Sequence, residues 1–386
     1  MTKQNLFTRL FVIAMLTVPL GALAAPAPEL GWINALAPGR DGALVASDRG
    51  LFVANPDGRV MLRAEWEGGF TALAADRAKA DVLYASGRSG GLLRSNDGGW
   101  HWQHPAQSGP DSFEILATGP SVLYGVADAL YESSDGGSHW RRSGVVPDKL
   151  ISLAVAAKDA KQLYAGTEAG LMESRDGGAH WRAAVVGPAR RLPATLIRVG
   201  EDGGLTRFDW GQGLLTERKA NAPWVPINNG FGGQAVLQLV REGRALVAAT
   251  NAAKLFVSRD GGSHWLPLGG YPRPVTAAAR RGEKLFVADC QVCHGDHGIG
   301  EAPRADSPQQ SLAPALDETA HAWHHPDQQL EGFILNGMPA PSRMVGWSGR
   351  LNAHDAQDLV AYIKSLWTPR ALRCQGPRHM DPDCRL

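Results

Sequence analysis

Cysteine is scarce in this chain, which has four in 386 residues. That number excludes a small scaffold held together by many disulfides. An excess of one charge is also lacking, because 39 Lys and Arg stand against 38 Asp and Glu, and this balance argues against a nucleic-acid partner. Beyond the N-terminal region, no apolar run is long enough to predict a membrane span.

Length, glycine and tryptophan are what the chain does have. A chain of 386 residues exceeds what one hydrophobic core usually holds, so two domains are expected. Its 46 Gly, 25 Pro and 12 Trp favour many short strands and turns over a helical bundle.

The N-terminus has the pattern of a secretory leader. Lys3 and Arg9 precede an apolar run from Leu10 to Leu23, and Ala22-Leu23-Ala24 predicts cleavage after Ala24. An uncleaved anchor is the alternative. Removal of residues 1–24 changes the formal charge from +1 to −1, since Lys3 and Arg9 leave with the leader.

The most specific motif is Cys290-Gln291-Val292-Cys293-His294. Two thiols at this spacing can each bond one vinyl group of a haem while the next His turns toward the iron, so the motif predicts one covalent haem c. A redox-active cysteine pair needs a βαβ context, and a zinc site needs a second ligand pair; neither is visible around the motif. Haem attachment in turn implies export, to a bacterial periplasm.

The other two cysteines, Cys374 and Cys384, lie in the tail over residues 371–386. An oxidising compartment favours their pairing as a disulfide, which would tie down this terminus. A metal site that uses Cys374, His379 and Cys384 is the alternative.

One phrase recurs four times, with the common form Ser-X-Asp-Gly-Gly-X-His-Trp. It begins at Ser95, Ser133, Ser174 and Ser258. Asp can accept hydrogen bonds from the turn, Gly-Gly supplies positive φ, and Trp folds back as an apolar plug. Two further units, ending at Trp66 and Trp224, keep the strand-like runs but lack the phrase.

The unit-ending tryptophans follow one another at intervals of 36 to 43 residues. A period of about forty with about four strands per unit is typical of a β-propeller. Residues 31–268 are therefore expected to form about six blades, with five or seven as alternatives.

The phrase resembles the Asp-box (BNR) repeat of sialidase-like propellers, sortilin-type receptors and photosystem II assembly-factor-like propellers. That resemblance implies boxes at outer turns, so Asp97, Asp135, Asp176 and Asp260 are not expected to be catalytic. The early arginine motif of sialidases is missing. Tyr84, Tyr124 and Tyr164 recur at equivalent strand positions, which predicts packing rather than nucleophiles, and His101, His139, His180 and His264 are read as turn residues.

A second, helical unit follows a linker over residues 269–274. Residues 275–289 are expected to form a helix, and Gly282 and Phe286 before the Cys-X-X-Cys-His motif resemble the opening of class I cytochrome c. The last helix, capped by Asn352, carries Leu359, Val360 and Ile363 on one face and resembles the closing helix of that family. The cytochrome c domain is thus expected over residues 275–370, with a middle helix from Asp327 to Asn336.

The resemblance also assigns the iron ligands. His294 would be the proximal ligand, oriented by the carbonyl of Pro314. Met344 is favoured as the distal ligand because it lies seven residues before Leu351, the spacing of the family; Met338, in a Met-Pro pair, is the alternative. His/Met ligation raises the potential and suits electron transfer.

Other histidines offer a further alternative. His321, His324, His325 and His354 are the other candidate ligands. The phrase around His324 and His325 is interpreted as a polar helix start, with a bis-His haem or a small copper site as the alternative.

Together these patterns predict an all-β propeller of about six blades followed by a small all-α cytochrome c domain. The function expected is one-electron transfer to a periplasmic redox partner protein, with the propeller as docking scaffold, no nucleic acid, and no membrane span after leader cleavage. Two alternatives are a sialidase-like glycoside hydrolase with an accessory cytochrome, and a periplasmic assembly or metal-handling factor with a haem redox switch.

Overall fold

A computed structural model describes residues 30–66, 69–87, 90–106, 108–184, 193–217, 222–227, 230–268, 274–302, 312–340 and 342–384. The expected leader over residues 1–24 and positions 269–273 of the expected linker lie outside these residues.

Residues 33–267 form six antiparallel sheets, each built from one continuous stretch of chain. The first two are β1 Ile33–Ala37, β2 Ala43–Ser47, β3 Gly50–Ala54 and β4 Val60–Ala64, then β5 Phe70–Ala75, β6 Leu83–Gly87 and β7 Gly91–Ser95. The next two are β8 Ile115–Gly119, β9 Val122–Val126, β10 Leu130–Ser133 and β11 Arg141–Gly144, then β12 Leu150–Val155, β13 Leu163–Thr167, β14 Gly170–Ser174 and β15 Arg182–Ala183. The last two are β16 Ala194–Val199, β17 Leu205–Asp209, β18 Gly213–Glu217 and β19 Val225–Pro226, then β20 Val236–Glu242, β21 Ala245–Thr250, β22 Leu255–Ser258 and β23 Leu266–Pro267.

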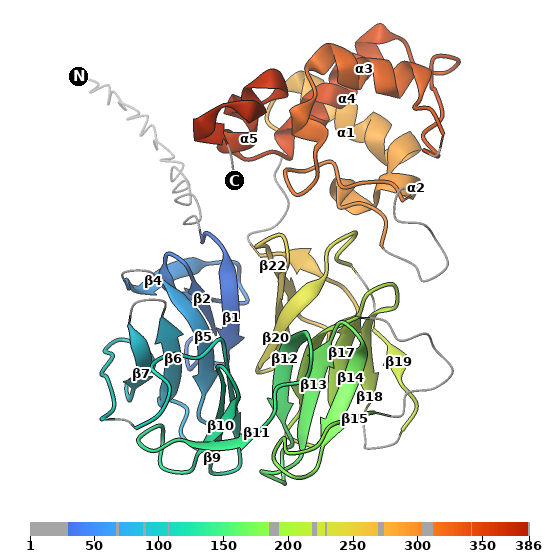
Figure 1. Ribbon diagram of the computed structural model, residues 1–386. Helices are drawn as coiled ribbons and strands as arrows, with labels where there is room; N and C mark the ends of the chain where they lie inside the picture. The colour runs from blue at the N-terminus through green and yellow to red at the C-terminus, as the bar shows by residue number, and fades with distance from the viewer. Residues whose placement is uncertain are drawn as a thin grey trace, which may run out of the picture.

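The sheets are arranged as blades around a ring (Figure 1). Their first strands, β1, β5, β8, β12, β16 and β20, contact one another in this order, and β20 returns to β1. The second sheet has three named strands, and the bridge between Arg94 and Gln103 stands at its fourth position. The molecule therefore contains a six-bladed β-propeller, and the expected fold class is confirmed.

Side chains close the ring between the first and sixth blades. Ile33 and Leu36 of β1 pack with Val240 of β20 and Val247 of β21 in one apolar cluster. The backbone N–H of Gly39 donates to Glu242 at 3.3 Å. The seam thus depends on packing and a few polar contacts.

The four repeated phrases share the turn that Asp and His form, whereas the bond of the tryptophan indole differs: Nε1 of Trp181 donates to Val145, outside its phrase. In the first, the Asp97 carboxylate accepts from the backbone N–H groups of Trp100 and His101 at 3.1 and 3.0 Å, and its second oxygen lies 2.6 Å from Nδ1 of His101. Gly98 and Gly99 have φ of 73° and 90°, where a Cβ would be strained. The indole of Trp102 folds back to donate to the Gly99 carbonyl at 3.1 Å. The predicted structural role of Asp and His in the phrase is confirmed.

The C-terminal unit is helical and lies above the propeller in Figure 1. Its elements are α1 Ala277–Leu285, η1 Phe286–Cys290, α2 Gln291–His294, η2 Asp296–Gly298, η4 Ala322–His324, α3 Asp327–Asn336, α4 Ala353–Ser365, α5 Pro369–Arg373, η5 Gly376–Met380 and η6 Pro382–Cys384. Among the described residues, none of these helices is long and apolar enough to cross a membrane.

Helices α1 and α4 cross closely, as the resemblance implied. A Cβ on Gly282 would lie 1.9 Å from the carbonyl oxygen of Asp358, so only glycine fits at this crossing. The rings of Phe286 and Tyr362 lie 5.1 Å apart. Arg281 donates twice to the Asp358 carboxylate, at 2.6 and 2.7 Å, and fixes the crossing further.

The first helix differs from the expected span of residues 275–289. It begins after Thr276, whose hydroxyl accepts from the backbone N–H of Ala279, and its α-helical part ends at Leu285. A wider turn then covers Phe286–Cys290. Such a turn adds a residue to the helical path and is common at functional sites. Here Phe286 belongs to the core, and both Phe286 and Cys290 line the cavity described below.

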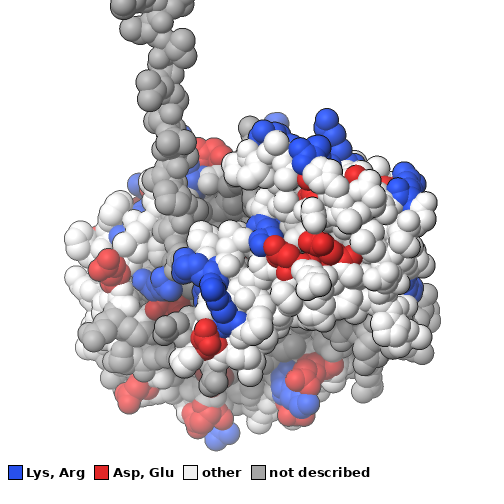
Figure 2. Space-filling view, turned by 90° about the horizontal axis from the view of Figure 1, so that it is seen from above, with Lys and Arg blue, Asp and Glu red and all other residues white. Residues whose placement is uncertain are grey.

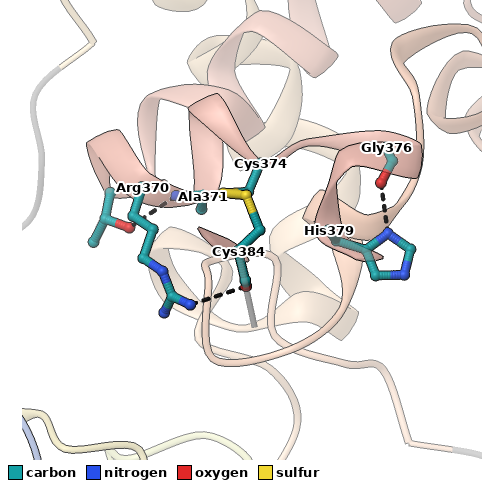
Figure 3. The surroundings of a disulfide bond; sticks show 7 residues. Arg370, Ala371, Cys374, Gly376, His379 and Cys384 are labelled. Carbon is teal, nitrogen blue, oxygen red and sulfur yellow. Dashed lines mark hydrogen bonds between the residues drawn. A yellow bond between two sulfur atoms is a disulfide. The ribbon is translucent and has the colours of Figure 1, made fainter. Parts of the chain in front are cut away.

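The tail over residues 369–384 folds back on the helices (Figure 3). Cys374 and Cys384 form a disulfide, and the side chain of Arg370 donates to the carbonyl of Cys384 at 2.9 Å. Nδ1 of His379 lies 2.5 Å from the Gly376 carbonyl. With both thiols in a disulfide, a metal site that needs Cys374 and Cys384 as thiolates is not formed in this structure.

Candidate functional site

A cavity of about 400 Å³ opens between the helices of the C-terminal unit. The attachment motif lines one part of it with Cys290, Cys293 and His294, and Met338 and Met344 also line it. Apolar side chains from α3 and α4 complete the lining: Leu330, Phe333, Ile334, Leu359 and Ile363. The cavity therefore collects residues that are far apart in the chain.

His294 is oriented from the adjoining loop. Its Nδ1 lies 2.9 Å from the carbonyl oxygen of Pro314. Because a carbonyl can only accept, Nδ1 carries the proton and Nε2 keeps its lone pair. Burial lowers the pKa of His294, against the opposing effects of the Pro314 carbonyl and the charge of Glu301. The imidazole is thus neutral at neutral pH, the form that binds metals.

The two cysteines of the motif are free thiols in this structure. Burial, together with the charge of neighbouring Asp289, raises the pKa of Cys290 to about 11. A redox-active cysteine pair requires a thiol whose pKa is lowered, so this environment argues against that alternative. Asp289 is itself buried and pairs with Arg350 at 2.7 Å, which links the motif to the segment before α4.

Both candidate distal methionines reach the cavity. A bridge joins Gly337 to Val345, and the N–H of Met338 donates to the Met344 carbonyl at 3.0 Å, so the two methionines lie on neighbouring segments. Met344 is half-buried, whereas Met338 is exposed. The choice of Met344 over Met338 therefore stays a prediction.

Sequence reasoning missed a link between the two sides of the cavity. Glu301 accepts from the backbone N–H of Ala313 at 3.2 Å, next to Pro314, and forms an ion pair with Arg343, next to Met344. The backbone N–H of Glu301 donates in turn to the Ala313 carbonyl at 2.9 Å. No local pattern marks this pair, because its members are 42 positions apart.

Two of the other histidines also reach the cavity, His321 and His325. His324 instead stacks on His379, with ring centroids 4.3 Å apart, and His354 lies 3.9 Å from Asp358 on α4. Over the described ranges, no group of three or more His, Cys, Asp or Glu side chains has the geometry to hold a metal ion.

These residues fit a haem c. Cys290 and Cys293 lie at one side of a largely apolar cavity. His294 presents a neutral imidazole whose Nδ1–H donates a hydrogen bond to the Pro314 carbonyl, which leaves Nε2 for a metal. A bound haem would supply one-electron chemistry at iron, with axial ligands and surroundings setting its potential.

The propeller tyrosines occupy the places expected of packing residues. Tyr84 and Tyr124 are buried and Tyr164 is half-buried. Burial, with a further contribution from Glu132, raises the pKa of Tyr124, whose hydroxyl donates to Glu132 at 3.1 Å and also contacts the Ala160 carbonyl. A phenol of raised pKa inside a blade is suited to packing rather than to nucleophilic attack.

The C-terminal unit is similar in sequence to known cytochromes. Residues 277–363 match the family model described as cytochrome C oxidase, cbb3-type, subunit III. The cbb3-type cytochrome c oxidase subunit FixP of Bradyrhizobium diazoefficiens is 31% identical over 99 residues, which make up 26% of this chain and 31% of FixP. The chain thus spans about a third of the length of this relative.

Solved structures resemble the propeller at low identity. The GH74 xyloglucanase from Xanthomonas campestris is 19% identical, with a TM-score of 0.41 over 61% of this chain and 38% of the enzyme. YCF48 from Cyanidioschyzon merolae is 15% identical, with a TM-score of 0.36 over 51% of this chain and 84% of YCF48. Similarities of this size carry no inference about activity, and the six blades rest on the sheet order itself.

The family match, the attachment motif and the cavity agree with one another. The chain therefore consists of a six-bladed β-propeller followed by a C-terminal cytochrome c domain, whose residues 277–363 match the cbb3-type subunit III model and which supports electron transfer through haem.

Proposed function

We propose that this protein is an exported electron carrier with one covalent haem c, and that its propeller is a docking scaffold for a redox partner. The observation that carries the proposal is the cavity in which Cys290, Cys293 and His294 meet two candidate methionine ligands. In the proposal Cys290 and Cys293 hold the haem, His294 is the proximal ligand, and Met344 is the distal ligand.

Exposed apolar side chains support contact with a partner close to the cavity. Val292, inside the attachment motif, is 88% exposed, and Val345, which lines the cavity, is 64% exposed. Seen from above, basic and acidic side chains lie in small mixed groups separated by uncharged surface (Figure 2). We therefore propose that a partner is recognised by apolar contact and shape more than by a large patch of one charge.

The relative and the leader pattern support the location. FixP is named as a subunit of a cytochrome c oxidase, and we propose a partner of the same broad kind, a respiratory redox protein. The leader pattern over residues 1–24, the tail disulfide and thioether-linked haem all suit the periplasm of a bacterium.

The test is expression in a periplasm equipped with haem ligation machinery, followed by mass spectrometry and a spectroscopic redox titration. The proposal expects one haem per chain, bound to Cys290 and Cys293, and a titration that fits a single one-electron step. A protein that emerges without covalent haem would refute it.

The same preparation separates the proposal from its rivals. A six-coordinate oxidised haem supports electron transfer, whereas an open coordination position would favour a sensor or a redox switch. Release of a chromophore from aryl sialoside or aryl glucoside substrates, lost after a propeller substitution, would favour the hydrolase.

A further inference from the structure

The sixth blade touches the cytochrome c domain close to its haem cavity. Gly232 has a φ of +58°, and a Cβ added there would lie 2.0 Å from the carbonyl oxygen of Ile299. The backbone of the propeller therefore lies directly against residues 299–300, a few positions after His294. This contact places the propeller beside the proximal side of the site.

A lysine of the same blade makes the second contact. Lys254 precedes β22, and its Nζ lies 2.8 Å from Oδ2 of Asp317 and 3.2 Å from Oε1 of Glu318 in the cytochrome c domain. Burial opposes the charge of Lys254, but the two carboxylates outweigh burial and raise its pKa. One lysine cation thus holds two acidic side chains of the other domain.

The acidic pair continues the segment that orients His294. Pro314 accepts from the imidazole. Two positions on, the backbone N–H of Leu316 donates to Gly298 at 2.7 Å and its carbonyl accepts from the indole of Trp367 at 2.8 Å. Asp317 follows directly, so residues 314–317 are fixed at one end by the proximal ligand and at the other by Lys254.

Glu318 depends on the same cation. Its Oε1 faces Lys254, while its Oε2 is buried and finds no hydrogen-bond partner among the residues that the structure describes. A buried carboxylate without compensation is costly. Removal of the lysine would leave Glu318 without its cation, whereas Asp317 would keep its hydrogen bonds from the backbone N–H and hydroxyl of Thr319.

We propose that Lys254 is a positioning residue through which the propeller fixes the proximal haem loop and sets the charge next to it. This inference rests on the proposed haem attachment. Two carboxylates without their cation stabilise the oxidised, more positive iron, and a loosened loop weakens the hold of Pro314 on the imidazole.

The test compares midpoint potentials of the full-length, haem-loaded protein. Lys254→Met is expected to lower the potential and Lys254→Arg to keep it close to that of the wild type. Glu318→Gln is expected to raise the potential, because it removes a negative charge and leaves the Lys254–Asp317 pair. Lys158→Met, at an exposed site between β12 and β13, is the control for the overall loss of one charge.

A second readout reports on the loop itself. In the reduced protein, the solvent exchange of the His294 Nδ1 proton, followed by NMR, is expected to be faster in Lys254→Met and restored in Lys254→Arg. Shifts of one sign in both Lys254→Met and Glu318→Gln would indicate packing damage and overturn the inference, as would potentials that do not move. A wild type without covalent haem refutes the proposed function instead, so the two failures are distinguishable.

Discussion

The contacts that stabilise the propeller join residues close in the sequence, whereas those that stabilise the cytochrome c domain join residues far apart in it. In each box turn, Asp and His are four positions apart, and the turn is complete within eight residues. In the cytochrome c domain, the partners are distant in the sequence: His294 and Pro314 at the cavity are 20 positions apart, and Arg281 and Asp358 at the crossing of α1 and α4 are 77 apart. A local turn can be repeated along the chain, and one copy can be lost without the others. The long-range contacts of the cytochrome c domain occur once, and they form only when all of its segments are in place.

The largest effect is expected from removal of the thiols. Cys290→Ala with Cys293→Ala should abolish covalent haem completely, because both thioether bonds are lost. Pyridine haemochrome assay and mass spectrometry measure the loss. Because each blade is paired within itself, the β signal of the propeller in circular dichroism should stay unchanged. A propeller that unfolds with haem loss would contradict this expectation.

Exchange of the distal ligand should have the next largest effect. Met344→Ala is expected to remove the weak long-wavelength band that the resemblance to His/Met cytochromes implies for the oxidised protein, and to lower the potential. Met338→Ala, the matched control from the same loop, should retain the band. Loss of the band in Met338→Ala alone would move the ligand to Met338.

The tryptophan at the end of one repeated phrase tests how much a single turn stabilises the propeller. Trp140 is 9% exposed, packs at a tilt against Phe113 with ring centroids 4.3 Å apart, and donates to the Gly137 carbonyl. Trp140→Ala should cost roughly 3–5 kcal/mol of unfolding free energy, measured by urea denaturation. Trp100→Ala, at a box tryptophan that is 57% exposed, is the control and should cost far less. The haem spectrum of both variants should match that of the wild type.

The tail disulfide should contribute less. It closes a loop with a sequence separation of 10, for which chain entropy predicts about 2–3 kcal/mol. Cys374→Ala with Cys384→Ala should lower the urea midpoint of the cytochrome c transition, monitored by haem absorbance, and leave the propeller transition in place. Equal shifts of both transitions would show that the tail stabilises the whole chain.

The smallest effect is expected in the pH dependence of the unfolding free energy, through the Asp of one repeated phrase. The backbone N–H of His180, then its side chain and the Ser174 hydroxyl, lower the pKa of Asp176 from 3.8 to about 2. A carboxylate of lowered pKa stabilises the fold above its unfolded pKa, and the stabilisation is lost as pH falls through the folded value. Between pH of about 4 and about 2, unfolding free energy should therefore fall less steeply in Asp176→Asn than in the wild type.

Local patterns predicted the parts of the structure whose causes are local. The box phrase predicted its own turn, Asn352 caps α4 with a capping box, and Gly337 ends α3 with a φ of 76°. Six tryptophan-ended units predicted six blades, because each blade is one continuous stretch of chain.

Contacts between segments that are far apart in the sequence could not be predicted, because no local sequence pattern marks them. Lys254 is one of nine lysines, no local pattern distinguishes it, and its role depends on how the two domains meet. The pair of Glu301 and Arg343 is equally hidden. The wider turn at Phe286–Cys290 lets Phe286 and Cys290 both line the cavity and pack against one core cluster, a tertiary arrangement that periodicity alone does not encode.

The seam of the propeller has a consequence for local unfolding. The first and sixth blades meet through side chains, and the sheet order shows each blade paired within itself. Opening the ring there breaks neither a backbone ladder nor a covalent link between successive blades, so this junction should separate in a sub-global opening before the other blade junctions do. Because Lys254 joins the cytochrome c domain to the sixth blade, the cytochrome c domain would stay attached to the sixth blade while the first blade moves away.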